Sequence, residues 1–236
     1  MKWSNRFVSF NFLKDWRLYL AEFLGTFVFV FIASTVIVVS NLYNDIGLIS
    51  VSLAIGFSYA AMVFITAHIS GGYLNPAITV SLWLAQRLSG LKAFFYLFSQ
   101  LIGSFAAAGV LLLIFKNSAL QFVLGAPTLG LNISPENAII VEAILTAILV
   151  FAVFGTMIDR NGPVSFGPLV LGLVVVSETI IALQISGAAL NPARALGPLV
   201  ISKSYANLAI WVIGPLVGSF FGIFYEAVFI KKPKKK

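Results

Sequence analysis

Residues 69–77 read Ile-Ser-Gly-Gly-Tyr-Leu-Asn-Pro-Ala, and residues 185–193 read Ile-Ser-Gly-Ala-Ala-Leu-Asn-Pro-Ala. Asparagine is a favoured N-cap, and proline at the first helical position loses no intrahelical hydrogen bond, so each Asn-Pro pair predicts a helix start. The apolar stretches around these starts, 74–84 and 190–201, are too short to cross a bilayer. We therefore expect two half-helices that enter the membrane without crossing it.

The second stretch repeats the first 116 positions later, and Glu22 and Thr26 recur as Glu142 and Thr146. Recurrence of several features at a spacing of about 115 to 120 residues indicates a tandem repeat. Its two copies cover about residues 18–115 and 138–230. Because three spans separate the copies, the second inserts upside down, which predicts an inverted repeat. The half-helices should then enter from opposite faces and meet near the membrane midplane.

The composition excludes a soluble fold. Of the 236 residues, 60% are hydrophobic and 10% charged, and the mean hydropathy is +1.01, so apolar side chains exceed what one soluble core buries. A span needs roughly 20 mostly apolar residues. Six runs are long enough: 18–39, 46–67, 91–115, 138–158, 164–183 and 206–230. We predict an all-α membrane protein of six spans and two half-helices, with residues 1–236 forming one domain.

The basic residues predict the orientation in the membrane. With six spans, twelve of the fifteen fall on the side that holds both termini, and Lys116, Arg194 and Lys203 fall on the other. Because cytoplasmic loops carry the excess of Lys and Arg, both termini should be cytoplasmic. Five lysines lie within residues 231–236, a tail that reads as a membrane-surface anchor rather than a nucleic-acid site. The expected location is the cell membrane.

The residue inventory disfavours most catalytic chemistry. The chain has no Cys and one His, which excludes disulfides and thiolate sites and argues against a metal cluster. It also offers no constellation of nucleophile and base. We expect neither an enzyme nor a cofactor or metal site.

The paired motifs Asn75-Pro76-Ala77 and Asn191-Pro192-Ala193 point to a pore instead. Two helix N-termini that meet at the midplane would repel cations there through their partial positive charges. The Asn75 and Asn191 amides could each donate a hydrogen bond to a neutral molecule. A water held through its oxygen by both amides would interrupt a proton-conducting chain.

Together these features resemble the major intrinsic protein family of aquaporins and aquaglyceroporins. The matching segments are 21–26, 68–77, Tyr96 and Gln100, 186–194 and 211–215. The resemblance implies one pore per protomer, a homotetramer in the lipid bilayer, and passive flow of water or small neutral solutes without a cofactor. It also implies that Arg194 is the outer selectivity-filter residue.

Family spacing places the other filter residues at Ile55, Thr179 and Ala188. These side chains are smaller than the Phe and His typical of water-selective relatives, so the mouth should be wider. Glycerol facilitators, however, typically carry aromatic filter residues and an Asp after the arginine, where this chain has Ala195. Phe57 remains an alternative filter residue if the second span is shifted by two positions.

Four further ionisable residues need an explanation, because charges within spans are costly. Glu22 and Glu142 occupy equivalent positions, so we interpret them as braces for the half-helix loops, with a proton relay as the alternative. Glu178 is interpreted as a buried carboxyl hydrogen-bonded to backbone or to Arg194, the alternative being a carboxyl exposed to the pore. His68, the single histidine, is a pore-lining candidate near the cytoplasmic mouth.

We therefore expect a passive channel for water that also admits small neutral solutes such as glycerol and excludes ions and protons. Two other transport functions stay open. A dedicated glycerol or polyol facilitator differs only in filter preference. An ion-coupled secondary transporter would need a coupling group, for which Glu178 is the one candidate.

Overall fold

The computed structural model describes residues 12–44 and 46–230, with side chains from residue 15 onward. Within those ranges the secondary structure is entirely helical. The elements are α1 (Phe12–Tyr43), α2 (Leu48–Ser70), α3 (Pro76–Leu84), α4 (Gly90–Phe115), α5 (Asn117–Leu120), η1 (Val123–Gly125), α6 (Pro135–Val153), η2 (Phe154–Ile158), η3 (Val164–Phe166), α7 (Gly167–Ala182), α8 (Pro192–Ile201), α9 (Ile210–Ser219) and α10 (Phe221–Val228). The predicted anchor at residues 231–236 lies outside the described residues.

The six predicted spans are confirmed. Six helical segments of the described chain are long and apolar enough to cross a membrane. The fourth is α6 continued by the π-helical turn η2, the fifth is η3 with α7, and the sixth is α9 with α10. Polar N-caps start two of them: the hydroxyl of Ser89 accepts from Lys92 N, and that of Ser134 accepts from Asn137 N.

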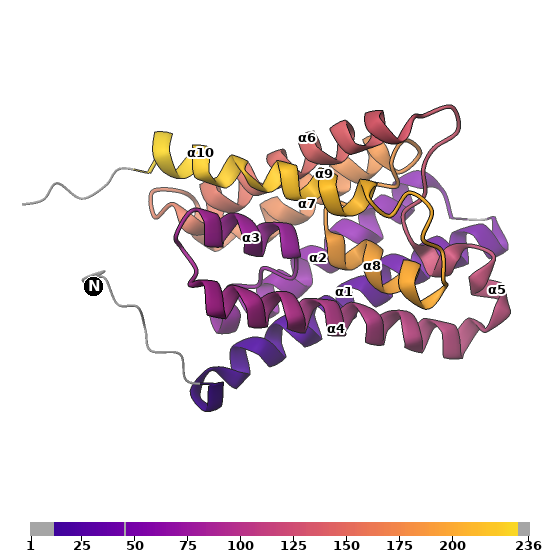
Figure 1. The fold of residues 1–236 in the computed structure, drawn as a ribbon, viewed down its shortest axis with the longest axis horizontal. Coiled ribbons are helices and arrows are strands. Elements are labelled where there is room, and N and C mark those ends of the chain that lie inside the picture. Colours follow the sequence, from indigo (N-terminus) through magenta and orange to yellow (C-terminus); the bar gives the residue numbers. More distant parts are fainter. Residues whose placement is uncertain (1–11, 45, 231–236) are drawn as a thin grey trace, which may run out of the picture.

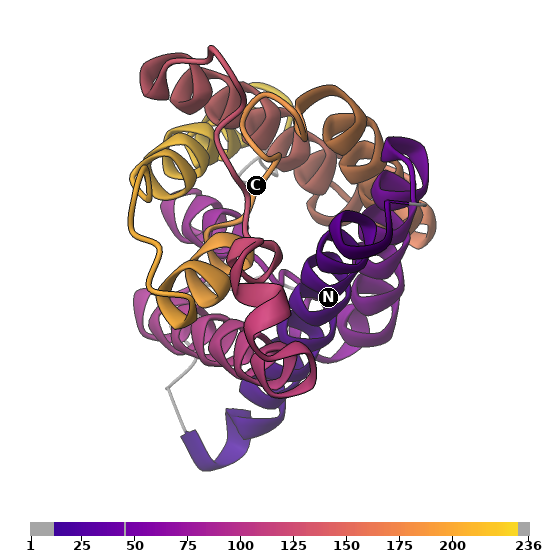
Figure 2. The same ribbon diagram turned by 90° about the vertical axis from the view of Figure 1, so that its right-hand side faces the viewer.

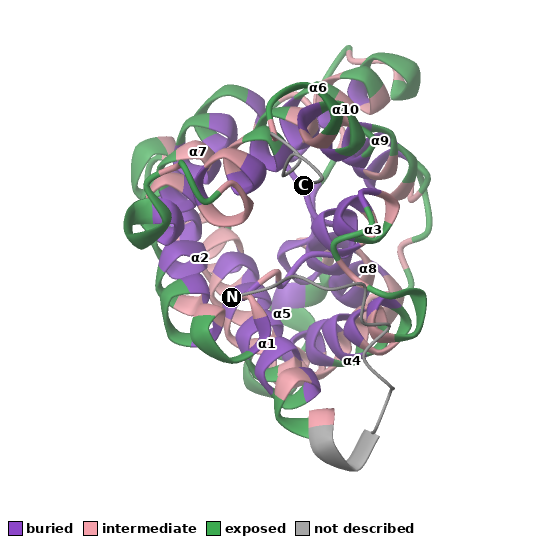
Figure 3. Cartoon of the chain, turned by 90° about the vertical axis from the view of Figure 1, so that its left-hand side faces the viewer, coloured by how far each residue is buried: buried purple, intermediate pink, exposed green. Residues whose placement is uncertain are grey.

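The helices form a ring when the bundle is viewed along its long axis (Figure 2). Helix α1 packs against α2 and α4, α2 against α7, and α6 against α9. In Figure 3 buried residues face the inside of the ring, and exposed residues cover its outside. Many of these exposed residues are large and apolar, including Phe57, Phe64 and Leu113, as a lipid-facing surface requires.

Glycine lets α2 and α7 cross closely at Gly56 and Gly172, which are 116 positions apart. A Cβ atom on Gly56 would lie 2.5 Å from the carbonyl oxygen of Gly172, and one on Gly172 would lie 2.8 Å from that of Gly56. The contact is therefore reciprocal, as expected of two copies related by a pseudo-two-fold axis. The inverted repeat that the sequence predicts is present in the fold.

The half-helices α3 and α8 enter from opposite ends of the bundle, and their N-termini approach each other (Figure 1). Both start where the Asn-Pro pairs predict, at Pro76 and Pro192. Leu74 and Leu190, with φ of 52° and 57°, lie outside the helices. Figure 1 also shows that α1 begins and α10 ends at the same end of the bundle.

Candidate functional site: a pore between two re-entrant loops

Asn75 and Asn191 are tied crosswise at the place where the half-helices meet. The Nδ2 of Asn75 donates to the carbonyl oxygen of Leu190, and the Nδ2 of Asn191 donates to that of Leu74, each over 2.9 Å. Their side-chain oxygens accept from the backbone N–H groups of Ala77 and Ala193, so they also cap the two half-helices. Because an amide nitrogen carries two hydrogens, each Asn keeps one donor free.

The first re-entrant loop, residues 71–75, is held by Glu22. This carboxylate accepts from the Oγ of Ser70 at 2.6 Å and from the backbone N–H groups of Tyr73 and Leu74 at 3.0 and 2.7 Å. A fourth donor, Nε2 of Gln100, lies 2.8 Å away. A buried carboxylate with four donors satisfies the backbone groups that a non-helical loop leaves unpaired at membrane depth.

The second re-entrant loop, residues 187–191, is held by Glu142 in the same way. Its carboxylate accepts from the Oγ of Ser186 at 2.6 Å and from the backbone N–H groups of Ala189 and Leu190 at 2.9 and 2.7 Å. These three bonds match those of Glu22 atom for atom.

One aromatic donor ties each loop to a span. The hydroxyl of Tyr96 donates to the carbonyl oxygen of Ser70 over 2.7 Å, and Nε1 of Trp211 donates to that of Ser186 over 2.6 Å. The two donors lie 115 positions apart, so they too occupy equivalent places in the two copies. Each loop is therefore held both through a backbone carbonyl oxygen at its start and through its backbone N–H groups.

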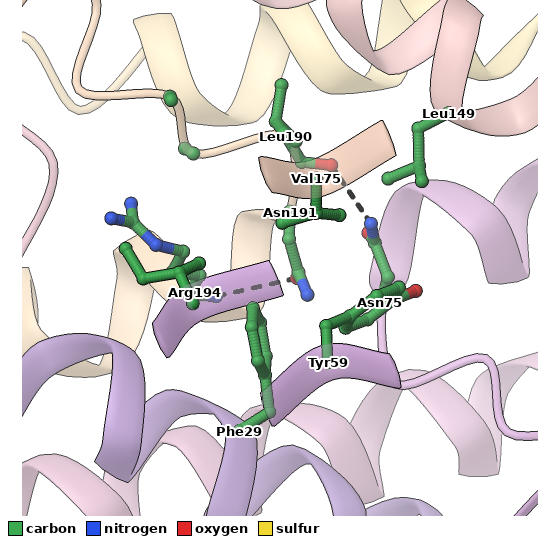
Figure 4. Close-up of a pocket in the computed structure, with 11 residues that line it drawn as sticks. Phe29, Tyr59, Asn75, Leu149, Val175, Leu190, Asn191 and Arg194 are labelled. Carbon is green, nitrogen blue, oxygen red and sulfur yellow. Dashed lines mark hydrogen bonds between the residues drawn. The ribbon is translucent and has the colours of Figure 1, made fainter. Parts of the chain in front are cut away.

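A small cavity lies between the two loops (Figure 4). The space in it that is open to the centre of a water molecule is about 10 Å³. That is room for roughly one water molecule, because a buried water needs on the order of 10–15 Å³ of such space. The cavity is lined by Phe29, Ile55, Tyr59, Asn75, Leu149, Val175, Ala188, Ala189, Leu190, Asn191 and Arg194.

Arg194 lines the same cavity from the first turn of α8. Its side chain is buried, and Nη1 donates to the carbonyl oxygen of Gly187 over 3.2 Å. Within residues 12–44 and 46–230, its Nε and Nη2 have no hydrogen-bond partner. The guanidinium therefore brings both a positive charge and unused donors to the cavity.

Of the other proposed filter residues, Ile55 and Ala188 line the cavity and Thr179 does not. The Oγ1 of Thr179 donates to the carbonyl oxygen of Val175 one turn earlier in α7, over 2.7 Å. The alternative filter residue, Phe57, is 49% exposed, whereas Ile55 is 1% exposed. The geometry thus favours Ile55 over Phe57.

A second cavity of about 190 Å³ is lined by the end of α1, the start of α2, residues 126–128, Leu183 and Gly187. Gly187 is the residue whose carbonyl oxygen holds Arg194. A wide space therefore lies next to the arginine, at the opposite end of the bundle from the start of α1 and the end of α10.

His68 does not line the central cavity. It follows Tyr59 by nine residues, which is about two and a half helical turns, so it faces away from the cavity. Its side chain is exposed, as are those of Phe64, Ile65 and Ile69 on the same face of α2. The prediction that His68 lines the pore near the cytoplasmic mouth, away from this cavity, stays a prediction.

Glu178 also departs from the sequence-based interpretation, which gave it a hydrogen bond to backbone or to Arg194. It is 3% exposed, and neither carboxyl oxygen has a hydrogen-bond partner in the described part of the chain. It does not line the cavity that the described residues enclose between the loops. The alternative of a pore-exposed carboxyl therefore gains no support.

Six apolar lining residues were missed in the sequence: Ala189 and Leu190 in the second loop, and Phe29, Tyr59, Leu149 and Val175 on the spans. The positions on the spans carry a signal, because Phe29 follows Glu22 by seven residues and Leu149 follows Glu142 by seven. Seven residues are two helical turns, which places each pair on one helix face. Tyr59 likewise lies one turn after Ile55.

Two inverted copies, two half-helices that meet N-terminus to N-terminus, and a water-sized cavity between them define a membrane channel. The profile of the family described as "Major intrinsic protein" matches residues 8–225, so the chain belongs to the major intrinsic protein family.

Among its relatives is "Aquaporin Z" of Photorhabdus laumondii, 33% identical over 92% of this chain and 99% of the relative. "Probable aquaporin TIP-type" of Medicago truncatula is 34% identical over 89% of this chain and 86% of the relative. The solved structure of the aquaglyceroporin from Plasmodium falciparum is similar with a TM-score of 0.77 and 26% identity, covering 91% of this chain and 96% of that one. The members of this family are channels and not enzymes.

Proposed function

We propose that this protein is a passive channel that conducts water rapidly, admits small neutral solutes such as glycerol more slowly, and excludes ions and protons. The observation that carries the proposal is the cavity with room for about one water, walled by the amides of Asn75 and Asn191. Each amide has one donor left for a passing molecule. Apart from Arg194, the other side chains of the wall are carbon-rich and offer such a molecule few competing partners.

Proton exclusion follows from the direction of these donors. A water oxygen that accepts from both Asn amides turns its hydrogens away from the midplane, so neighbouring waters are not linked through it as a proton chain. The N-termini of α3 and α8 add partial positive charge at the same place. Arg194 adds a full charge, which repels cations, and its Nε and Nη2, which have no partner among the described residues, attract neutral oxygen atoms.

The supporting residues divide by role. Asn75, Pro76 and Ala77 with Asn191, Pro192 and Ala193 form the central constriction. Ile55, Ala188 and Arg194 form the filter, and Thr179 supports it from one turn beyond Val175. Glu22 and Glu142 hold the loops that carry the Asn residues. Both repeats, residues 18–115 and 138–230, thus act as one channel domain.

The proposed setting is the cell membrane, with both termini in the cytoplasm. The distribution of basic residues supports this orientation. We propose a homotetramer of channels, each with its own pore, in line with the large apolar side chains exposed around the bundle.

A dedicated glycerol facilitator is the second candidate. The small filter side chains Ile55 and Ala188 favour it, as does the likeness to an aquaglyceroporin structure. The room for about one water at the midplane argues for water as the main solute.

Stopped-flow light scattering of proteoliposomes separates these functions. We expect fast shrinkage in an impermeant osmolyte, slower re-swelling in an inward glycerol gradient, and no dependence of either rate on an imposed sodium or proton gradient. Water flux equal to that of empty vesicles would overturn the proposal. Glycerol entry as fast as water flow would favour the facilitator, and solute uptake driven by an ion gradient would indicate a coupled transporter.

A further inference from the structure

The side chains that line the central cavity differ between the two copies of the repeat. Phe29 and Leu149 follow the paired glutamates by seven residues in the two copies, so they are equivalent. Tyr59 and Val175 lie 116 positions apart, the same spacing as the crossing glycines of α2 and α7. All four line the cavity. At both pairs the first copy has an aromatic ring and the second an aliphatic side chain.

The two rings form a single unit. Phe29 and Tyr59 meet edge to face, with their centroids 5.0 Å apart and an interplanar angle of 64°. Both are buried, at 3% and 1% exposure. An edge-to-face pair of this kind packs favourably and restricts the movement of both rings. The aromatic wall is therefore a fixed part of the pore.

The phenol of Tyr59 has a second fixed contact. Its hydroxyl donates to the carbonyl oxygen of Tyr73 over 3.1 Å, and Tyr73 lies two residues before Asn75 in the first loop. Figure 4 shows Tyr59 and Asn75 at the same cavity. The ring is thus held by its packing against Phe29 and by the hydrogen bond of its hydroxyl to the loop, and it lines the cavity together with Asn75.

We infer that Tyr59 is a specificity-determining residue: its ring, fixed by Phe29 and Tyr73, sets the width of the pore at the midplane and restricts polyols there. This inference rests on the proposed function of a water channel. On this inference, the size of the solutes that pass is limited mainly by the aromatic side of the central cavity. It is not limited mainly by the filter, where Ile55 and Ala188 are small.

The repeat supplies the test substitution. Tyr59→Val installs the residue that the second copy uses at the equivalent position, Val175. We expect glycerol flux through proteoliposomes to rise about tenfold or more relative to water flux, since small changes of volume in an apolar site give discrimination of that order. Tyr59→Phe keeps the ring and loses only the hydroxyl, so its glycerol-to-water ratio should stay within about twofold of the unmodified protein.

Phe57→Val is the matched control, because Phe57 lies on the same helix and is 49% exposed. It should leave the glycerol-to-water ratio unchanged. Tyr59→Leu, which removes the ring but keeps more of its volume than valine does, is made alongside in case the valine variant conducts no water.

The outcomes separate the two proposals. A protein that conducts no water even when unmodified contradicts the proposed function. A protein that conducts water, but whose Tyr59→Val or Tyr59→Leu variant conducts water with an unchanged glycerol ratio, contradicts only the role of Tyr59. If both variants lose water flux, Tyr59 is needed for the fold rather than for selection, and the inference also fails.

Discussion

The two re-entrant loops are built alike and yet differ in what surrounds them. Each loop is held by a glutamate that accepts from one serine hydroxyl and two backbone N–H groups, and each carries an Asn that reaches across to the other loop. The first loop has an additional donor, Gln100, and an aromatic pore wall. The second has Arg194, and close to its brace Glu142 lies Glu178, whose carboxyl has no hydrogen-bond partner in the described part of the chain. The shared bonds build the scaffold, and the differences set selectivity.

The largest expected effect comes from removing either brace. Glu22→Ala or Glu142→Ala leaves at least three buried donors unpaired, at about 1–3 kcal/mol each, so we expect each variant to lose roughly 3 kcal/mol or more of stability. Thermal unfolding in detergent measures this loss. Glu136→Ala, at an exposed glutamate in the first turn of α6, is the control. If one of the two brace variants is as stable as this control, the loops are not equivalent.

The next largest effect is expected from removing Gln100, the additional donor of the first loop. The position equivalent to Gln100 in the second copy is Pro215, four residues after Trp211 as Gln100 is four after Tyr96. Gln100→Leu should therefore leave Glu22 with the three donors that Glu142 has. We expect a loss of about 2 kcal/mol, the usual contribution of a hydrogen bond to a charged group, with water flux retained. A collapse of water flux in a folded Gln100→Leu variant would show that the fourth donor is essential.

A change of selectivity follows from removing the charge beside the second loop. Arg194→Ala takes a fixed cation and its donors from the cavity wall, so glycerol flux relative to water should rise by about tenfold. That ratio corresponds to about 1.4 kcal/mol. Lys203→Ala, at an exposed basic residue just beyond α8, controls for the loss of one positive charge. Equal solute ratios in the two variants would remove Arg194 from the filter.

The smallest expected effect is a gain in stability. Glu178 is equivalent to Met62 in the first copy, by the spacing of 116 that relates Gly56 to Gly172. Glu178→Met removes a buried carboxyl that has no partner in the described part of the chain, so stability should rise by about 1 kcal/mol. Thermal unfolding beside Glu226→Met provides the comparison, because Glu226 is ion-paired with Arg87 at 2.8 Å and should lose stability instead. A less stable Glu178→Met protein would show that this carboxyl has a stabilising contact.

The sequence predicted the scaffold better than the pore wall. Hydropathy and the two Asn-Pro pairs gave the spans and half-helices, because length and capping are local properties. The glutamate pair was visible because the repeat places Glu22 and Glu142 at the same point. The face of α2 that lines the pore could not be predicted from the sequence, since the helix has apolar residues on the lipid side, the packing side and the pore side alike. That is why Tyr59 was overlooked.

Proton exclusion is the most direct test of a pore centred on two crossed Asn residues. Proteoliposomes that contain a pH-sensitive dye can be given a pH gradient and, separately, an osmotic step, so that proton flux and water flux are measured in the same vesicles. We predict water flux well above that of empty vesicles and proton flux equal to theirs. Proton flux that rises together with water flux would contradict the proposed orientation of water at Asn75 and Asn191.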